Sequence, residues 1–108
     1  MELNDVKEIY EEFIASKHQT LVKSLINYAV KYSNLRVEWL LSDIETRIEI
    51  DVVRTRAHNA LISSCNALAR NMRESGENVH WRTLIGEDRK SIGDFAVLLV
   101  AVMGIRAR

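Results

Sequence analysis

Proline is absent from all 108 residues of this chain, and the four glycines lie at positions 76, 86, 93 and 104. Proline and glycine are the residues that most often interrupt helices and strands, so no strong interruption precedes Gly76. Apolar residues make up 47% of the sequence, which is enough to offset the entropy lost on folding. We therefore predict one ordered domain over residues 1–108, with long helices and few connections.

The first helix is predicted over residues 5–32, because apolar residues recur at helical spacing through this stretch. Asp5 followed by Glu8 is typical of a helix start, since both side chains bind free backbone amides there. Polar residues 17–19 interrupt the apolar stripe, which indicates either a kink or a place where the helix leaves the core. The Ser-Asn pair at 33–34 is expected to end this helix before a short apolar segment.

A second long helix is predicted over residues 43–75, from a capping box at 42–45 to a glycine stop at Gly76. The alternating residues 47–51 also fit a β-strand, but no second strand is present to pair with it. We expect this helix to lie antiparallel to the first. Its predicted core face consists of Ile44, Ile48, Val52, Thr55, Ala57, Ala60, Leu61, Ser64, Leu68 and Met72.

Two further helices complete the predicted all-α bundle of four to five helices. A short helix over 79–85 is expected to stop at Gly86. The last helix is expected to start near Glu87-Asp88 and to stop at Gly104. From Phe95 onward it is apolar on all sides, so it must be surrounded by other helices or by a second chain.

Net charge and targeting signals place limits on the setting of the chain. The formal net charge is zero, but residues 1–51 carry 10 acidic and 6 basic side chains, whereas residues 52–108 carry 5 and 9. A single cysteine, Cys65, excludes an intrachain disulfide, and the amino-terminal residues lack the pattern of a secretion signal. The longest apolar run is too short to cross a bilayer. We expect a cytoplasmic protein with no membrane span.

Carboxylates and histidines suggest metal chemistry only as an alternative. Di-iron bundles need two Glu-x-x-His motifs, and this chain has one, Glu77 to His80, so no metal site and no cofactor are predicted. All-helical nucleotide hydrolases that use Mg²⁺ or Mn²⁺ place four carboxylates on facing helices. Their Glu-x-x-Glu motif, followed later by Glu-x-x-Asp, does not occur in that order in this chain. The acidic residues available for such a site are Glu8, Glu11, Glu12, Glu45, Glu49 and Asp51.

Cysteine chemistry and nucleic-acid binding are further alternatives. Cys65 lies two turns after His58, but its apolar neighbours favour packing over nucleophilic catalysis. Basic residues in the second half suit a nucleic acid, yet acidic residues interleave with them in the sequence, so a helical protein partner is favoured. The interleaved acidic residues are Glu74, Glu77, Glu87 and Asp88.

The stretch from Trp81 to Phe95 is the most distinctive in the chain. Asp94 precedes the wholly apolar part of the last helix, and a shielded carboxylate needs a partner. We expect Arg82 or Arg89 to form an ion pair with Asp94 that docks the short helix on the last one. The alternative is that these residues and Asp88 form a binding site for a ligand.

The tail from Trp81 to Gly104-Ile105-Arg106-Ala107-Arg108 resembles a small family of uncharacterised bacterial helical proteins. The resemblance covers about a quarter of the 108 residues and rests on no chemical motif. It implies a helical fold and a bacterial or phage origin, and it implies no activity.

A homodimer is predicted from the dimensions of the helices. A helix over 5–32 would be longer than the compact diameter of such a domain, so it must kink or be covered by a second subunit. An interaction or regulatory module is therefore the first interpretation of function. The expected interface residues are Phe95, Leu98, Leu99 and Val102.

Overall fold

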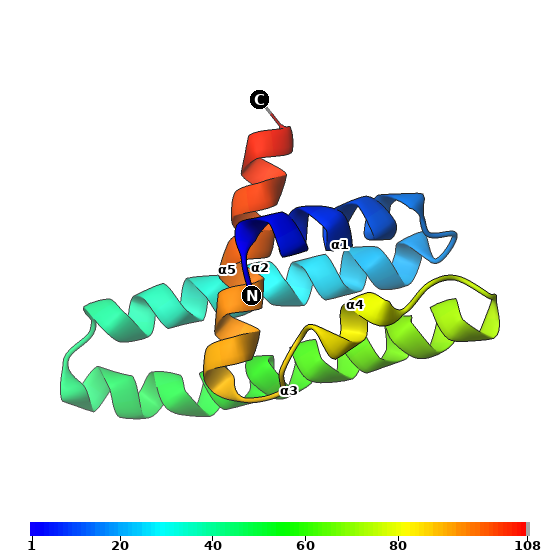
Figure 1. The fold of residues 1–108 in the computed structure, drawn as a ribbon. Coiled ribbons are helices and arrows are strands. Elements are labelled where there is room, and N and C mark those ends of the chain that lie inside the picture. Colours follow the sequence, from blue (N-terminus) through cyan, green and yellow to red (C-terminus); the bar gives the residue numbers. More distant parts are fainter. Residues whose placement is uncertain (108) are drawn as a thin grey trace.

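Two long antiparallel helices form the base of the structure, a computed structural model that describes residues 1–107. These are α2 (Gln19–Leu41) and α3 (Ile44–Glu74), which lie side by side in Figure 1. The remaining helices are α1 (Leu3–Ala15), α4 (His80–Thr83) and α5 (Arg89–Arg106). No strand occurs in residues 1–107, so the all-α prediction is confirmed.

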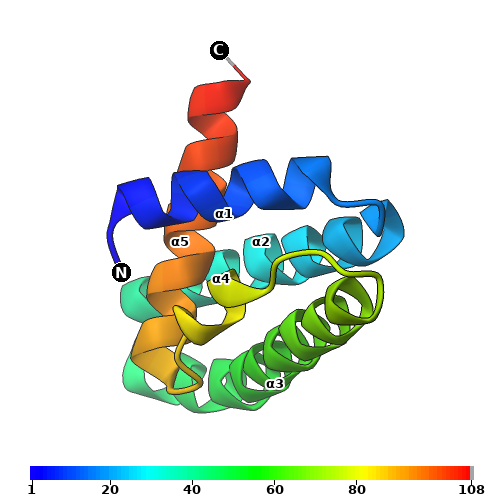
Figure 2. The same cartoon turned by 45° about the vertical axis from the view of Figure 1, so that its right-hand side comes forward.

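The layers of the bundle are set by α5, which runs across the middle of the α2–α3 hairpin and not along it (Figures 1 and 2). α1 packs on α5 and α2, and α4 packs on α3. Gly93 leaves room for the Arg36 side chain of α2, because a Cβ atom at position 93 would lie 2.7 Å from the Arg36 Nη1 atom. The longest dimension of the molecule, 47 Å, matches the length of about 46 Å expected for the 31 residues of α3.

The predicted first helix over 5–32 is wrong, because the chain reverses at residues 16–18 and forms two helices. Ser16 is extended, and the side-chain amide of Gln19 donates to the carbonyls of Phe13, Ile14 and Ser16, at 2.9, 3.2 and 2.6 Å. These bonds satisfy carbonyls at the end of α1. The polar gap in the sequence therefore marks a turn between two helices.

The predicted break at 33–34 is also wrong, because α2 continues through this pair to Leu41. Serine and asparagine each cost only tenths of a kcal/mol inside a helix. Buried Tyr32 and half-buried Trp39 keep the packing face continuous across the pair. The long antiparallel pair is thus α2 and α3.

The predicted helix over 43–75 is confirmed to within a residue at each end. The Asp43 side chain accepts a 2.8 Å hydrogen bond from the Thr46 amide at its start. At its end Gly76 has a φ of +81°, and the amides of Gly76 and Glu77 donate to the carbonyls of Arg73 and Met72. This pair of bonds is a Schellman motif, which glycine favours because it has no Cβ atom.

Gly76→Ala is expected to lower the free energy of unfolding by about 1 kcal/mol, because alanine resists positive φ. No atom lies within 4 Å of the added Cβ atom, so the loss would come from the backbone alone. Gly104→Ala is the matched control, because Gly104 also has open space but lies inside α5. Urea denaturation should show an unchanged or higher stability for the control. Equal losses in the two variants would contradict the Gly76 geometry.

The end of α5 departs from the sequence prediction. The helix begins after Asp88, whose carboxylate accepts from the Ser91 amide and hydroxyl at 3.1 and 2.7 Å, as expected. It does not stop at Gly104 but continues to Arg106. Gly104 does not adopt the positive φ that ends a helix, so it is an ordinary helical residue here.

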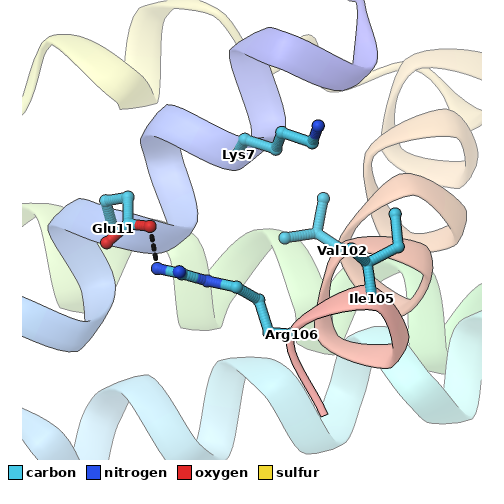
Figure 3. A pocket seen from close by; sticks show the side chains of 5 residues that line it. All are labelled: Lys7, Glu11, Val102, Ile105 and Arg106. Carbon is cyan, nitrogen blue, oxygen red and sulfur yellow. Dashed lines mark ion pairs between the residues drawn. The ribbon is translucent and has the colours of Figure 1, made fainter. Parts of the chain in front are cut away.

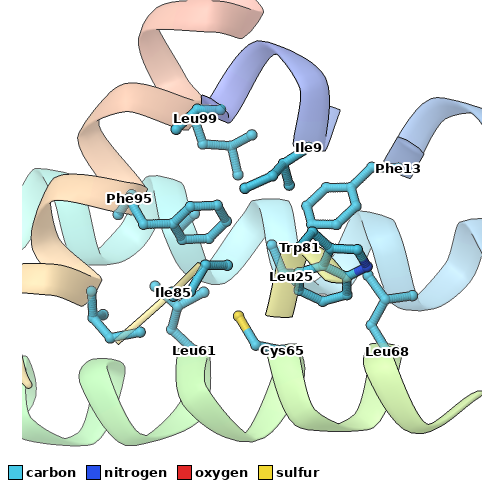
Figure 4. Packing of buried hydrophobic residues seen from close by; sticks show 14 of the residues in the cluster. Ile9, Phe13, Leu25, Leu61, Cys65, Leu68, Trp81, Ile85, Phe95 and Leu99 are labelled. Carbon is cyan, nitrogen blue, oxygen red and sulfur yellow. The ribbon is translucent and has the colours of Figure 1, made fainter. Parts of the chain in front are cut away.

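Side chains from all five helices form one apolar core, part of which is drawn in Figure 4. Trp81 of α4 is 1% exposed and meets the Phe13 ring edge to face, with the ring centroids 4.9 Å apart. Phe95 and Leu99 bring α5 into the same cluster. Trp81 therefore anchors the short α4 in the core. Within the described residues, no helix combines the length and apolar character needed to span a membrane.

Polar side chains close the end of the bundle where α1 turns into α2. The His18 ring lies 2.9 Å from the Ser75 Oγ atom and 3.3 Å from the Glu77 carboxylate. The Lys17 amide also donates to Glu77, at 3.3 Å. The first interhelical turn is thereby joined to the end of α3.

Candidate interaction surface

The opposite end of the α2–α3 hairpin carries exposed aliphatic side chains, which we call the hairpin tip. Large exposed aliphatic residues are common singly, but contiguous patches mark interaction sites. Six residues at adjacent helical positions around the α2–α3 turn are 52–83% exposed. The hairpin tip consists of Val37, Leu40, Leu41, Ile44, Ile48 and Val52.

This surface continues the face of the hairpin that α5 covers. Val37 and Leu40 line a pocket of about 350 Å³ together with Val97 and Leu98 of α5. Thr55, which follows Val52 by one turn of α3, accepts a hydrogen bond from Arg89 at the start of α5. α5 therefore covers the middle of the hairpin face and leaves the hairpin tip without a covering helix.

The α3 residues of the hairpin tip were predicted to be core. Ile44, Ile48 and Val52 are 75, 67 and 55% exposed, so this part of the prediction is wrong. The later positions Ala57, Leu61, Leu68 and Met72 are buried as predicted. The difference arises because α5 crosses α3 near Thr55 and does not extend over the first turns of α3 (Figure 1).

Polar contacts hold the hairpin tip in one shape. The guanidinium groups of Arg47 and Arg54 lie over the Trp39 ring, 4.4 and 4.5 Å from its centroid. Arg47 also donates to the carbonyls of Trp39 and Leu40, at 2.8 and 3.1 Å, and so satisfies the end of α2. The Ser42 hydroxyl donates to the Glu38 carbonyl at 2.6 Å. The apolar side chains therefore project from a preorganised turn.

Exposed carboxylates lie on the same two segments as this apolar surface. Glu38, Glu45 and Glu49 are exposed on the same segments, and none of the three forms an ion pair within residues 1–107. Asp51 differs, because it lies 3.3 Å from Arg54. The hairpin tip thus has an aliphatic centre, with three carboxylates on the same segments and with Arg36 and Arg56 beside it.

Three of the four interface residues expected on α5 lie inside the chain. Phe95, Leu99 and Val102 are 0, 0 and 2% exposed, so a second subunit would not reach them. Leu98 is half-buried and lines the pocket beside the hairpin tip. The aliphatic residues that α5 does expose are Val97, Val100 and Ile105.

Asp94 does have ion-pair partners, but they differ from the expected ones. Arg36 of α2 lies 3.3 Å from its carboxylate and Lys90 lies 2.8 Å from it. The hydrogen bond from Lys90, and then that from Arg36, hold the pKa of Asp94 below its usual range. The pair therefore links α5 to α2, at the edge of the pocket beside the hairpin tip.

The two arginines expected near Asp94 are engaged elsewhere. Arg82 donates to the Asn66 side chain and the Ile85 carbonyl, each at 2.8 Å, and to Glu87 at 2.9 Å. Arg89 donates to Thr55. Asp88 caps α5, and its hydrogen bonds with Ser91 lower its pKa. Arg82, Asp88 and Arg89 therefore fix the connection between α3 and α5, and they do not converge with Asp94 on one site.

A second surface pocket lies at the far end of α5, where Val102 and Ile105 face Lys7 and Glu11 of α1 (Figure 3). Arg106 forms an ion pair with Glu11 and so connects the end of α5 to α1. The pocket holds about 230 Å³. It is a local junction between helices, apart from the hairpin tip.

The acidic residues considered for a hydrolase do not gather around one metal position. Residues 1–107 contain no group of three or more side chains arranged to hold a metal ion. Asp5, Glu8, Glu12 and His80 do line a pocket of about 240 Å³. Burial, and then the neighbouring Glu8 carboxylate, raise the pKa of Glu12. The acidic residues of α3 are absent from this pocket, so two carboxylate sets do not face each other.

Cys65 is fully buried, and desolvation raises the pKa of its thiol to about 12. A thiol with this pKa is neutral at pH 7 and is a poor nucleophile. The His58 ring lies 3.0 Å from the Glu87 carbonyl, not against the sulfur. Both residues thus have structural contacts that explain their burial.

Comparisons with known proteins give no guide to function, so the functional proposal is based on the hairpin tip. No family model, curated protein or solved structure matches this chain. The resemblance of the carboxyl-terminal tail to a bacterial helical family stays a prediction. Sequence reasoning missed Val37, Leu40 and Leu41, although a signal was present: apolar residues flank both sides of the helix-breaking Ser42-Asp43.

Proposed function

We propose that this protein is an interaction module that forms a homodimer through the hairpin tip. The observation that carries the proposal is an ordered helical turn with six exposed aliphatic side chains. In a twofold arrangement the same surface of each subunit packs on the other, and α3 of one copy lies against α3 of its partner. The two hairpins then form a four-helix contact that covers the hairpin tip, which α5 leaves exposed.

Removing the hairpin tip from water is the driving force of the proposed dimer. Burial of apolar surface contributes about 25 cal/mol per Å². Because the turn is already fixed by Trp39, Arg47 and Arg54, little further ordering is needed on association. The proposal places the protein in a reducing cytoplasm, which suits its single buried, unpaired Cys65.

Sedimentation equilibrium of the unmodified chain tests the proposal. The expected result is a reversible dimer at micromolar concentration. A monomer throughout the accessible concentration range would reject the homodimer, and the hairpin tip would then be available only to a different helical protein.

Salt should strengthen the proposed dimer. Glu38, Glu45 and Glu49 of the two subunits approach each other when the hairpin tips meet, and their repulsion is screened by salt. Raising NaCl from about 0.05 M to about 0.5 M is expected to lower the dimer Kd by roughly 3- to 10-fold. The measurement is sedimentation at each salt concentration. A Kd that rises with salt would contradict tip-to-tip packing, because it would indicate ion pairs between the subunits.

A further inference from the structure

The second half of α3 presents a polar stripe to solvent. Its residues recur at intervals of three and four, so they share one face of the helix, and all are exposed. From first to last they span about 26 Å at the standard helical rise. Figure 2 shows α3 along the lower edge of the bundle, with no helix beneath it. The stripe consists of Arg56, Asn59, Ser63, Asn66, Arg70 and Arg73.

The stripe is basic, although acidic residues interleave with basic ones in the sequence. No aspartate or glutamate occurs between Val52 and Arg73. The three stripe arginines form no ion pair within residues 1–107, and the acidic side chains near the stripe have other partners. Asp51, which lines a surface hollow with Arg56, binds Arg54. Glu77 binds His18 and Ser75, Glu87 binds Arg82, and Asp88 caps α5. Glu74, which follows Arg73, is the exception and forms no ion pair within residues 1–107.

The uncharged side chains of the stripe also supply hydrogen-bond donors. The Asn66 Oδ1 atom accepts from the Arg82 Nε atom at 2.8 Å. Arginine has only donors, so the oxygen of the amide must face Arg82 and the NH₂ group is left for a ligand. Arginine, asparagine and serine side chains are among the groups that bind phosphate oxygens in nucleic acids. The stripe is therefore chemically suited to a polyphosphate backbone.

We infer that the stripe on α3 binds duplex DNA. The major groove of B-form DNA admits a single α-helix, and arginine and asparagine are frequent contacts in it. Single strands are bound chiefly by stacking on aromatic rings, and residues 52–73 contain no Phe, Tyr or Trp. The major groove of double-stranded RNA is too narrow for side chains to read. The stripe begins at Arg56, one turn after the hairpin-tip residue Val52, whereas Arg70 and Arg73 lie at the opposite end of α3 from the hairpin tip.

Fluorescence anisotropy with a labelled DNA duplex of mixed sequence tests the inference. Three arginine-phosphate contacts predict a slope of log K against log salt of about −3. Arg70→Gln and Arg73→Gln should each weaken binding and reduce the magnitude of this slope by about one. Lys23→Gln is the matched control, because it removes the same charge from an exposed position on α2 and should leave affinity and slope unchanged.

Several outcomes would overturn the inference. One is the absence of duplex binding at low salt. Another is equal weakening by Lys23→Gln and by Arg70→Gln, which would indicate a response to net charge alone. Equal or tighter binding to single-stranded DNA, or to phosphatidylserine vesicles, would assign the stripe to a different partner. Circular dichroism of each variant distinguishes lost binding from lost folding.

Discussion

Ile48→Asp is expected to weaken self-association by at least about 100-fold, which corresponds to about 2.7 kcal/mol. Ile48 lies at the middle of the three hairpin-tip positions on α3 and is 67% exposed in the single chain. In a twofold dimer every substitution is present twice, so two carboxylates would be placed at the centre of an apolar contact. A charge buried without a partner is among the most costly changes at an interface.

The fold itself should tolerate this change, because Ile48 makes few contacts within its own chain. Substitutions at exposed positions usually alter the free energy of unfolding by less than about 0.5 kcal/mol. Val53→Asp is the matched control, since Val53 is also exposed on α3 but lies outside the hairpin tip. Sedimentation should show that the control still dimerises. Equal dimerisation by Ile48→Asp would reject the hairpin tip as the interface.

Trp81→Ala should lower the free energy of unfolding by about 3–5 kcal/mol. Trp81 is the buried residue of the short α4, and its edge-to-face contact with Phe13 joins that helix to α1. Domains of this kind are stable by only about 5–15 kcal/mol, so a loss of this size removes much of the total. Trp81→Phe keeps a ring in the site and should lose less.

Urea denaturation followed by circular dichroism measures this effect for both Trp81 variants. Trp39→Ala is the control, because Trp39 is half-buried and its main partners are Arg47 and Arg54. Its expected loss is about 1–2 kcal/mol, the sum of two cation–π contacts. If Trp81→Ala lost no more than Trp39→Ala, the docking of α4 described above would be incorrect.

Local signals in the sequence were sufficient to predict both ends of α3 and the start of α5. Asp43, Gly76 and Asp88 act within one turn of the residues they cap, so their effects are encoded in short segments. The turn at 16–18 was harder to predict, because no glycine or proline marks it. It depends on Gln19, whose amide replaces the missing helical hydrogen bonds at the end of α1.

The candidate surface could not be predicted from periodicity alone. An apolar stripe such as Ile44, Ile48 and Val52 has the same spacing whether a helix covers it or not. Its exposure is decided by the path of α5, which contacts residues far away in the sequence, as in the Arg36–Asp94 ion pair. These two residues are 58 positions apart in the chain. Contacts of this range leave no local pattern.

The polar closure formed by His18, Ser75 and Glu77 has a consequence for the shape of any assembly. Its side chains are polar, and within residues 1–107 Ile14 is the one large exposed aliphatic residue beside the 16–18 turn, at that end of the 47 Å long molecule. Growth beyond two copies would need a second adhesive end, and the closure does not supply one. Subunits joined at their tips would instead form a finite rod, which should tumble more slowly than a sphere of equal mass.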